Sequence, residues 1–391
     1  MKFEDRQKIV SSISLKQIII DTIKRERFQG DKSATLHPSS SSVELKGKYL
    51  DKLVVGGCLR KQYWDIKNTP EPWYPSVYLL LTMMLGNAVE DATVKMFHDS
   101  GRLRAPTMLS GQPAMINTDL NIKGLMDAVM RGELGDISLL PGETTDIITE
   151  IKSFFGYYAK RKFEGFRHSF YPYLSNDQEH LLLQNKAQKD LTKEEKKLLA
   201  FNKTVRYCTG FPREHQLFQL VSYLHHFYKT VPGGKFLYMG RDNPEIFEFD
   251  VVLKDLKHNP NHQAIVVNGK EVKWCTTIDI YRRYGKLKSY VDNNEVPPAD
   301  YKRWYSFEDV KKRWLEQHVA GTNYHPFTSL VTKKHFSDAL VREKQGELHA
   351  GFGDFYCEGC QYEDRCQKYS KTQRLSETST ESSGSIKGCS K

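Results

Sequence analysis

The sequence has no apolar run long enough to cross a membrane and no secretory signal at its start. No stretch approaches the roughly eighteen consecutive apolar residues that mark a membrane-spanning helix. The opening residues, MKFEDRQKIV, contain an acidic pair and lack the apolar core and small-residue cleavage site of a signal peptide. We therefore expect an intracellular protein, in the cytoplasm of a cell or of a viral host, with no membrane partner.

Cysteine is scarce, with 7 in 391 residues. Thiols stay reduced inside cells, so these cysteines favour metal ligands or inert buried thiols over disulfides. The run Cys357-x2-Cys360-x5-Cys366 is typical of a metal centre. A zinc site or an iron–sulfur cluster needs a fourth thiolate. The candidates are Cys58, Cys208, Cys275 and Cys389, and of these Cys389 lies in a Ser/Thr-rich tail that we expect to be disordered.

Positive charge is in excess. The formal net charge is +10 and the isoelectric point is about 9.0, which favours a polyanionic partner. Nucleic acid is the first candidate and an anionic membrane surface the second. The length suggests one large domain with additions, or two domains.

Much of this charge lies between residues 157 and 206, which contain eleven Lys or Arg against six Asp or Glu. Aromatic residues interleave there with Lys160, Arg161 and Lys162. Rings that stack on bases, mixed with charges that neutralise phosphates, are typical of a track for single-stranded nucleic acid. The same rings would also suit a buried core, and the pattern leaves both interpretations open.

Periodicity and breaker residues predict the other elements. We expect an amphipathic helix over 5–27, a Ser-rich linker over 30–44, and a long helix over 77–99 that ends at Gly101 and carries Glu90. A helix should begin at Pro212, with Gln219 and Tyr223 one turn apart on one face. Two strands are expected at 235–240 and 246–252, and further helices at 272–291 and 306–318.

Two segments rich in β-branched and apolar residues, 124–129 and 145–153, are predicted to be strands. If they pair, Asp127 comes beside Glu150. Glu150 and Lys152 leave their strand on the same face, because side chains alternate along a strand. Two carboxylates and a lysine at one point suit Mg²⁺ or Mn²⁺ held against a phosphate. Glu-x-Lys also occurs on solvated strands, so the triad needs support from other motifs.

Six motifs occur in one order along the chain. They are Cys58-x-Arg60-x2-Tyr63-Trp64, Gly86-x3-Glu90, Gly124-x2-Asp127, Glu150-x-Lys152, Gln219-x3-Tyr223 and the cysteine run at 357–366. In this order they resemble the RecB/AddB-type branch of the PD-(D/E)xK nucleases. The likeness is greatest to the iron–sulfur exonucleases associated with CRISPR adaptation and their phage-borne relatives, and it covers residues 55–368.

The resemblance implies an α/β fold with a PD-(D/E)xK, restriction-endonuclease-like core, whose mixed central sheet is flanked by helices and closed by an iron–sulfur clasp. The nuclease domain would span 45–369, after an N-terminal helix and linker at 1–44. It would contain a basic helical insertion at about 156–210 and precede a disordered tail at 370–391.

The resemblance also implies roles for individual residues. Asp127, Glu150 and Lys152 would be catalytic. The metal ligands for Mg²⁺ or Mn²⁺ would be Glu90, Asp127 and Glu150. Gln219 and Tyr223 would be DNA-binding residues that help position DNA and the active-site side chains; the DNA contacts of Lys160, Arg161 and Lys162 rest on the basic and aromatic pattern above. A [4Fe–4S] cluster, or less well a zinc ion, would be bound by Cys58, Cys357, Cys360 and Cys366.

The implied activity is hydrolysis of DNA phosphodiester bonds, more as an exonuclease than an endonuclease, on DNA that is single-stranded or has free ends. Lys152 would orient water or stabilise the transition state, because a lysine with its ordinary pKa near 10.4 is a poor base at neutral pH. Two features depart from the family: Glu90 stands where histidine is frequent, and the basic segment from about 163 to 206 looks inserted. The alternative is a non-catalytic nucleic-acid-binding protein that keeps the fold and a zinc or iron–sulfur site.

Overall fold

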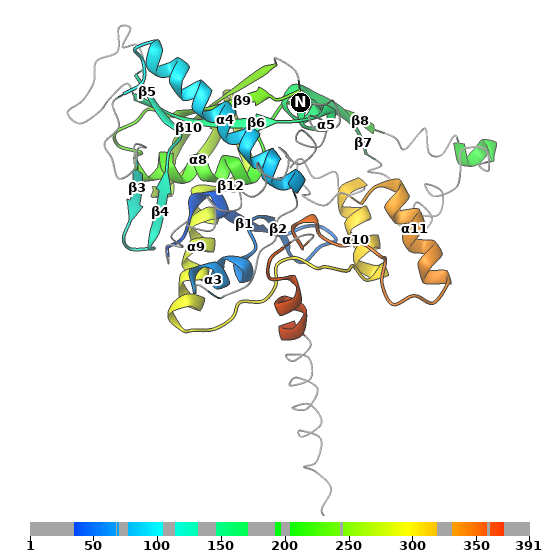
Figure 1. Ribbon diagram of the computed structural model, residues 1–391. Helices are drawn as coiled ribbons and strands as arrows, with labels where there is room; N and C mark the ends of the chain where they lie inside the picture. Colours follow the sequence, from blue (N-terminus) through cyan, green and yellow to red (C-terminus); the bar gives the residue numbers. More distant parts are fainter. Residues whose placement is uncertain are drawn as a thin grey trace, which may run out of the picture.

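The computed structural model describes residues 35–67, 69, 77–104, 114–131, 146–170, 192–196, 204–242, 245–318, 331–357 and 360–370. Its main sheet contains β5 (Ala128–Arg131), β6 (Asp146–Phe154), β9 (Gly234–Gly240), β10 (Ile246–Leu256), β11 (Asn259–Val267) and β12 (Lys270–Thr276). The spatial order is β12-β11-β10-β9-β6-β5. Strands β6 and β9 run parallel and the other neighbours run antiparallel. The predicted mixed α/β sheet flanked by helices is confirmed (Figure 1).

Helix α8 (Glu214–His226) covers one face of this sheet, next to α9 (Thr277–Asp292). The predicted apolar stripe of α8 is buried, and a Cβ added to Gly234 of β9 would lie 3.0 Å from Leu220. This close approach brings the helix onto the strand that runs parallel to β6. Because a parallel pair needs a long crossover, the segment between β6 and β9 has room for both the insertion and α8.

Helix α4 (Val77–Asp99) packs against β6 on the opposite face. A Cβ on its Gly86 would meet Ser153 Oγ at 3.4 Å, and Thr93 Oγ1 contacts Met239 Sδ at 2.9 Å. Ser153 alternates with Lys152 along β6, so α4 and α8 lie on opposite sides of the strand that carries the predicted site (Figure 1).

Three two-stranded sheets surround the main sheet. They are β1 (Ser42–Leu45) with β2 (Leu53–Gly56), β3 (Ala114–Asn117) with β4 (Ile122–Leu125), and β7 (Gly165–Phe170) with β8 (Thr204–Thr209). Short helices lie beside them: η1 (Pro38–Ser40), α3 (Leu59–Ile66), α5 (Tyr157–Glu164) and η3 (Phe355–Cys357). A second, smaller core joins α10 (Phe307–His318) to α11 (Lys333–Lys344), with the rings of Trp314 and Phe336 5.0 Å apart.

Segments far apart in the sequence meet at α3. The ring of Trp64 lies 5.2 Å from that of Tyr362, and Tyr362 donates a hydrogen bond to Asp65 Oδ1 at 3.0 Å. Tyr362 immediately precedes a helical segment at 363–370, which Figure 1 shows below the main body. The fold therefore brings the first and last predicted cysteine motifs to the same place.

Several predicted elements are confirmed: the helices at 77–99 and 306–318 and the strands at 235–240 and 246–252 each match an observed element within a few residues. Gly101 follows α4 with φ +71°, as its predicted role at the helix end requires. None of the helices in the described part of the chain is both long enough and apolar enough to cross a membrane.

Other predictions were wrong. The strand expected at 124–129 is interrupted at Met126 and Asp127, because β4 pairs with β3 whereas β5 pairs with β6. The helix expected from 272 begins at Thr277; residues 270–276 form an edge strand with three exposed charged residues, in which Val272 and Cys275 are buried. Asn268 and Gly269 both have positive φ, +47° and +74°, in the turn that joins β11 to β12. Asn-Gly is a strong hairpin signal that the sequence analysis missed.

The predicted helical insertion at 156–210 is also only partly helical. Helix α5 is followed by the antiparallel pair β7–β8, and helix returns only at 193–196 within the described residues. The linker predicted up to residue 44 ends earlier, because Ser42–Leu45 form β1 and pair with β2. The helix predicted at 5–27 and the tail beyond residue 370 lie outside the described residues.

Candidate active site and cysteine cavity

The pairing of β5 with β6 assembles the predicted triad. Ala128 lies opposite Thr149, so Asp127 precedes β5 beside Glu150. Asp127 Oδ2 accepts hydrogen bonds from the backbone of Ile151 at 2.8 Å and from Lys152 Nζ at 3.1 Å. Lys152 Nζ also lies 2.5 Å from Glu150 Oε1. The three side chains that the sequence predicted to converge do lie together.

Glu150 is fully buried, with 0% of its surface exposed. Neither carboxylate oxygen has a hydrogen bond of good geometry among the described residues, although Lys152 forms an ion pair with one of them. Burial raises the pKa of Glu150, the charge of Asp127 adds to this, and Lys152 offsets part of it. Two orphaned carboxylate oxygens in the interior leave room for a further positive partner.

Lys152 stays protonated in this environment. Burial by itself would lower its pKa, but the carboxylates of Glu150 and Asp127 outweigh burial and raise the pKa well above its ordinary value. A lysine base would need the opposite shift. Lys152 can therefore donate hydrogen bonds and neutralise negative charge, and it is unsuited to accept a proton at neutral pH.

Glu90 of α4 belongs electrostatically to the same group. Its pKa is raised to about 7, first by burial and then by the charge of Asp127, while Lys152 acts in the opposite direction. Three carboxylates therefore influence one another electrostatically beside one ammonium. The predicted metal ligands Glu90, Asp127 and Glu150 are the three carboxylates.

Gln219 and Tyr223, both on α8, connect to the carboxylate site through hydrogen bonds. Gln219 Nε2 donates to the Tyr223 hydroxyl at 3.3 Å, and that hydroxyl donates to the carbonyl of Leu125 at 2.8 Å, two residues before Asp127. Only 8% of Gln219 and 1% of Tyr223 is exposed, so direct contact with DNA, as predicted for both, does not fit this structure. Their contacts hold the segment that carries Asp127.

Gly124 of the Gly124-x2-Asp127 motif is explained by the same packing. A Cβ at this position would lie 2.7 Å from Tyr223 Cε1 and 2.8 Å from Pro38 Cγ. No larger residue fits without moving the tyrosine or the proline. The glycine therefore serves the approach of Tyr223 to the strand end.

The basic segment is tied to the protein by ion pairs. Lys162 Nζ lies 2.5 Å from Glu214 Oε2, and Lys160 pairs with Glu245 and with Glu164. Two of the three predicted phosphate contacts are thus already neutralised by carboxylates, while Arg161 is partly exposed. Phe154 and Phe163 are core residues, with rings 5.2 Å apart, so the core interpretation holds for these two aromatics.

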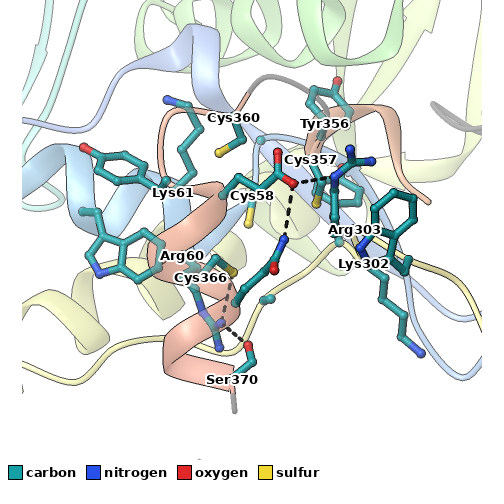
Figure 2. A pocket seen from close by; sticks show the side chains of 18 of the residues that line it. Cys58, Arg60, Lys61, Lys302, Arg303, Tyr356, Cys357, Cys360, Cys366 and Ser370 are labelled. Atoms are coloured by element: carbon teal, nitrogen blue, oxygen red, sulfur yellow. Dashed lines mark hydrogen bonds and ion pairs between the residues drawn. The ribbon is translucent and has the colours of Figure 1, made fainter. Parts of the chain in front are cut away.

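The four predicted cysteine ligands line one cavity of about 860 Å³. Cys58 precedes α3, Cys357 ends η3, and Cys360 and Cys366 follow it (Figure 2). Burial raises the pKa of Cys58 to about 11. Burial also raises the pKa of Cys357, and the charges of Asp354, Cys58, Cys360 and Cys366 add to it.

Cys275 is buried away from this cavity, in the main core. The sequence left Cys275 as a candidate for the fourth ligand of the metal centre. Its position outside the cavity excludes it from that role. The side chain of Cys208 and the whole of Cys389 lie outside what is described.

The side chains of both regions carry donor atoms of the kinds that bind metals. Their arrangement, however, is not that of a metal site. No group of three or more His, Cys, Asp or Glu among the described side chains is arranged so that it could hold a metal ion. At the carboxylates, the Lys152 ammonium stands between Asp127 and Glu150. In the cavity, four thiols from two parts of the chain face one space (Figure 2), and thiols are the donors that zinc and iron–sulfur centres use.

The start of α8 connects the cysteine cavity to the basic segment. His215 lines the cysteine cavity, and its neighbour Glu214 is the buried partner of Lys162. Burial lowers the pKa of His215 to about 3, with further lowering by Arg213, Lys162 and Lys152. The histidine is therefore neutral at physiological pH.

No protein-family model matches this chain, and neither a curated protein nor a solved structure matches it. The sequence analysis missed Glu214 and His215, and it gave Arg60 no role at the cavity. Only Arg60 carried a signal, its place in the Cys58-x-Arg60 motif.

Proposed function

We propose that the chain is a metal-dependent deoxyribonuclease of the PD-(D/E)xK type, acting as an exonuclease on DNA that is single-stranded or has free ends. The observation that carries the proposal is the buried Glu150, whose two oxygens lack hydrogen bonds beside Asp127 and Lys152. A buried carboxylate without hydrogen bonds is costly unless a cation compensates it. With one lysine among three carboxylates, Glu150 and Glu90 have raised pKa values, and a divalent cation could take the place of the protons that these carboxyl groups hold.

Asp127, Glu150 and Glu90 would supply the oxygen ligands that Mg²⁺ and Mn²⁺ prefer. When bound, the cation supplies neutralisation of the scissile phosphate and a lowered pKa for a water molecule. Lys152, held protonated by its neighbours, would donate to the phosphate or orient the attacking water. Tyr223 and Gln219 would keep Asp127 in place through Leu125.

The cysteine cavity supports the second part of the proposal, a [4Fe–4S] cluster bound by Cys58, Cys357, Cys360 and Cys366, with zinc as the alternative. Cys58 and Cys357 are 299 residues apart, so a centre bound by both would close most of the described fold into one loop. Phosphodiester hydrolysis needs no electron transfer. The centre would therefore stabilise the fold.

The second candidate is a DNA-binding protein without activity. It is favoured by the position of Lys152, which already neutralises Asp127 and Glu150, and by the lack of a preformed metal-ligand group among the described residues. This candidate requires DNA binding without cleavage under any metal condition.

Cleavage of end-labelled linear DNA and of covalently closed circular DNA, with Mg²⁺, Mn²⁺ or EDTA, tests the proposal. We expect metal-dependent loss of the linear substrates only, and a fall of roughly 10³-fold or more in Glu150→Ala. Glu248→Ala is the matched control, because Glu248 lies on the same sheet in an exposed pair with Lys235. Wild-type cleavage by Glu150→Ala would overturn the site, and binding without cleavage by the wild type would favour the second candidate.

A further inference from the structure

Arg60 is a buried cation at the wall of the cysteine cavity. It is the second residue of α3, and only 3% of its surface is exposed. Its Nε donates to the carbonyl of Pro297 at 2.8 Å. Its Nη1 donates to Ser370 Oγ at 2.9 Å and to Cys366 Sγ at 3.2 Å, the two contacts that Figure 2 shows.

This guanidinium has no carboxylate partner in the part of the chain that the structure describes. Arg283 provides the contrast, because it is equally buried and pairs with Asp300 at 2.6 Å and Glu44 at 3.0 Å. A buried charge without a counter-charge is strongly unfavourable, whereas a paired one is tolerated. The surroundings of Arg60 therefore indicate a negative partner.

Aromatic rings compensate only part of this charge. The guanidinium lies 5.1 Å from the ring of Tyr369 and 6.0 Å from that of Trp64. Such contacts are weaker than an ion pair, since they use the quadrupole of a neutral ring. They also exclude water from the guanidinium, which increases the need for an anion.

Cys366 is the one ionisable group among the three hydrogen-bond acceptors of Arg60. A thiol becomes a thiolate when it binds a metal, and four thiolates around zinc or a [4Fe–4S] core give a centre with a net negative charge. We propose that Arg60 is the counter-ion of this anionic centre, with its Nη1 positioned on the Cys366 sulfur. The inference rests on the proposed metal centre and holds for zinc and for iron alike.

The test compares three variants of the full-length protein as it is isolated: Arg60→Gln, Arg60→Lys and Lys61→Gln. Glutamine removes the charge while its amide can still donate a hydrogen bond, and lysine keeps the charge. Lys61 is the matched control, because it is the next residue, lines the same cavity and already pairs with Asp65 at 2.6 Å. Iron, zinc and sulfide are quantified, and release of the metal to a colorimetric chelator is timed.

We expect Arg60→Gln to release the metal about 10-fold to 100-fold faster than the wild type, the usual effect of losing a group that supports a metal ligand. Arg60→Lys should restore slow release, and Lys61→Gln should match the wild type. If the centre contains iron, Arg60→Gln should also shift its reduction potential to more negative values, because the lost cation favoured the more negative, reduced form. A merely structural arginine would produce neither the rescue by lysine nor the shift.

Unchanged release from Arg60→Gln, or equal acceleration in Lys61→Gln, would overturn the role of Arg60. If Arg60→Gln yields no soluble protein, Arg60→Lys decides: retention of the metal supports the need for charge, and loss of metal despite the charge overturns it. A wild-type protein that contains neither iron nor zinc would instead overturn the metal centre itself. The metal content of the wild type therefore separates the two failures.

Discussion

The carboxylate site and the cysteine cavity differ in the groups that surround their buried cation. Around Lys152, one ammonium is shared by Asp127, Glu150 and Glu90, and the raised pKa values of Glu150 and Glu90 show that their ionised forms lack enough positive charge. Around Arg60, a buried guanidinium donates to the thiol of Cys366 and has no carboxylate partner among the described residues. The first environment favours a hard cation bound by oxygen, and the second favours an anionic thiolate centre.

The two regions also differ in how the chain assembles them. Asp127, Glu150 and Lys152 come from strands that are neighbours in sequence, and the β5–β6 pairing alone brings them together. The cysteines come from both ends of the described fold and meet only because α3 packs against residues 360–370. Damage to the cysteine region should therefore affect stability, whereas damage to the carboxylate region should affect chemistry.

The largest stability effect is expected from Cys58→Ser. Loss of this ligand opens a loop of 299 residues, which should cost on the order of several kcal/mol and lower the melting temperature by about 5 °C or more. Metal content should fall with it. Cys275→Ala is the control, since Cys275 is buried outside the cavity and should keep full metal content. Thermal melting beside metal analysis checks this, and a full metal complement in Cys58→Ser would contradict the assignment.

A smaller effect is expected at the start of α8. Lys162→Met leaves the buried Glu214 without its partner, so the free energy of unfolding should fall by about 2 kcal/mol or more. Lys160→Met removes a neighbouring lysine whose carboxylate partners are far more exposed, and stability should hardly change. Urea unfolding of both variants measures the difference. Equal stability of the two would show that the Lys162–Glu214 pair does not anchor α8.

The smallest effect concerns pH. Because the pKa of Glu90 is raised to about 7 in the folded protein, the native state binds more protons than the unfolded state above the ordinary value of 4.5. Without added divalent cation, stability should therefore decrease as pH rises from about 4.5 to 7. Glu90→Gln should reduce this decrease, and added Mn²⁺ should oppose it in the wild type by binding the ionised form. Denaturant unfolding at pH 5 and 7.5 tests this, and an unchanged slope in Glu90→Gln would remove Glu90 from the site.

Much of the carboxylate site could be predicted from the sequence because its geometry is local. Alternation along β6 places Glu150 and Lys152 on one face, and glycine and proline between the strands favour their pairing. The long helix 77–99, which carries Glu90, follows from its apolar length and from Gly101 at its end. These features depend on spacings of a few residues, which any arrangement of the rest of the chain would preserve.

Tertiary structure decided what each of these side chains faces. The spacing of Gln219 and Tyr223 predicted that they share a face, but only the packing of α8 showed that this face is buried under Leu125. Lys160 and Lys162 look equivalent in the sequence, yet only Lys162 reaches a buried carboxylate. Local geometry determines which residues share a face of a helix turn. The burial of that face and the partners of its side chains depend on segments far away in the sequence. For the same reason, only the fold placed Arg60 beside Cys366.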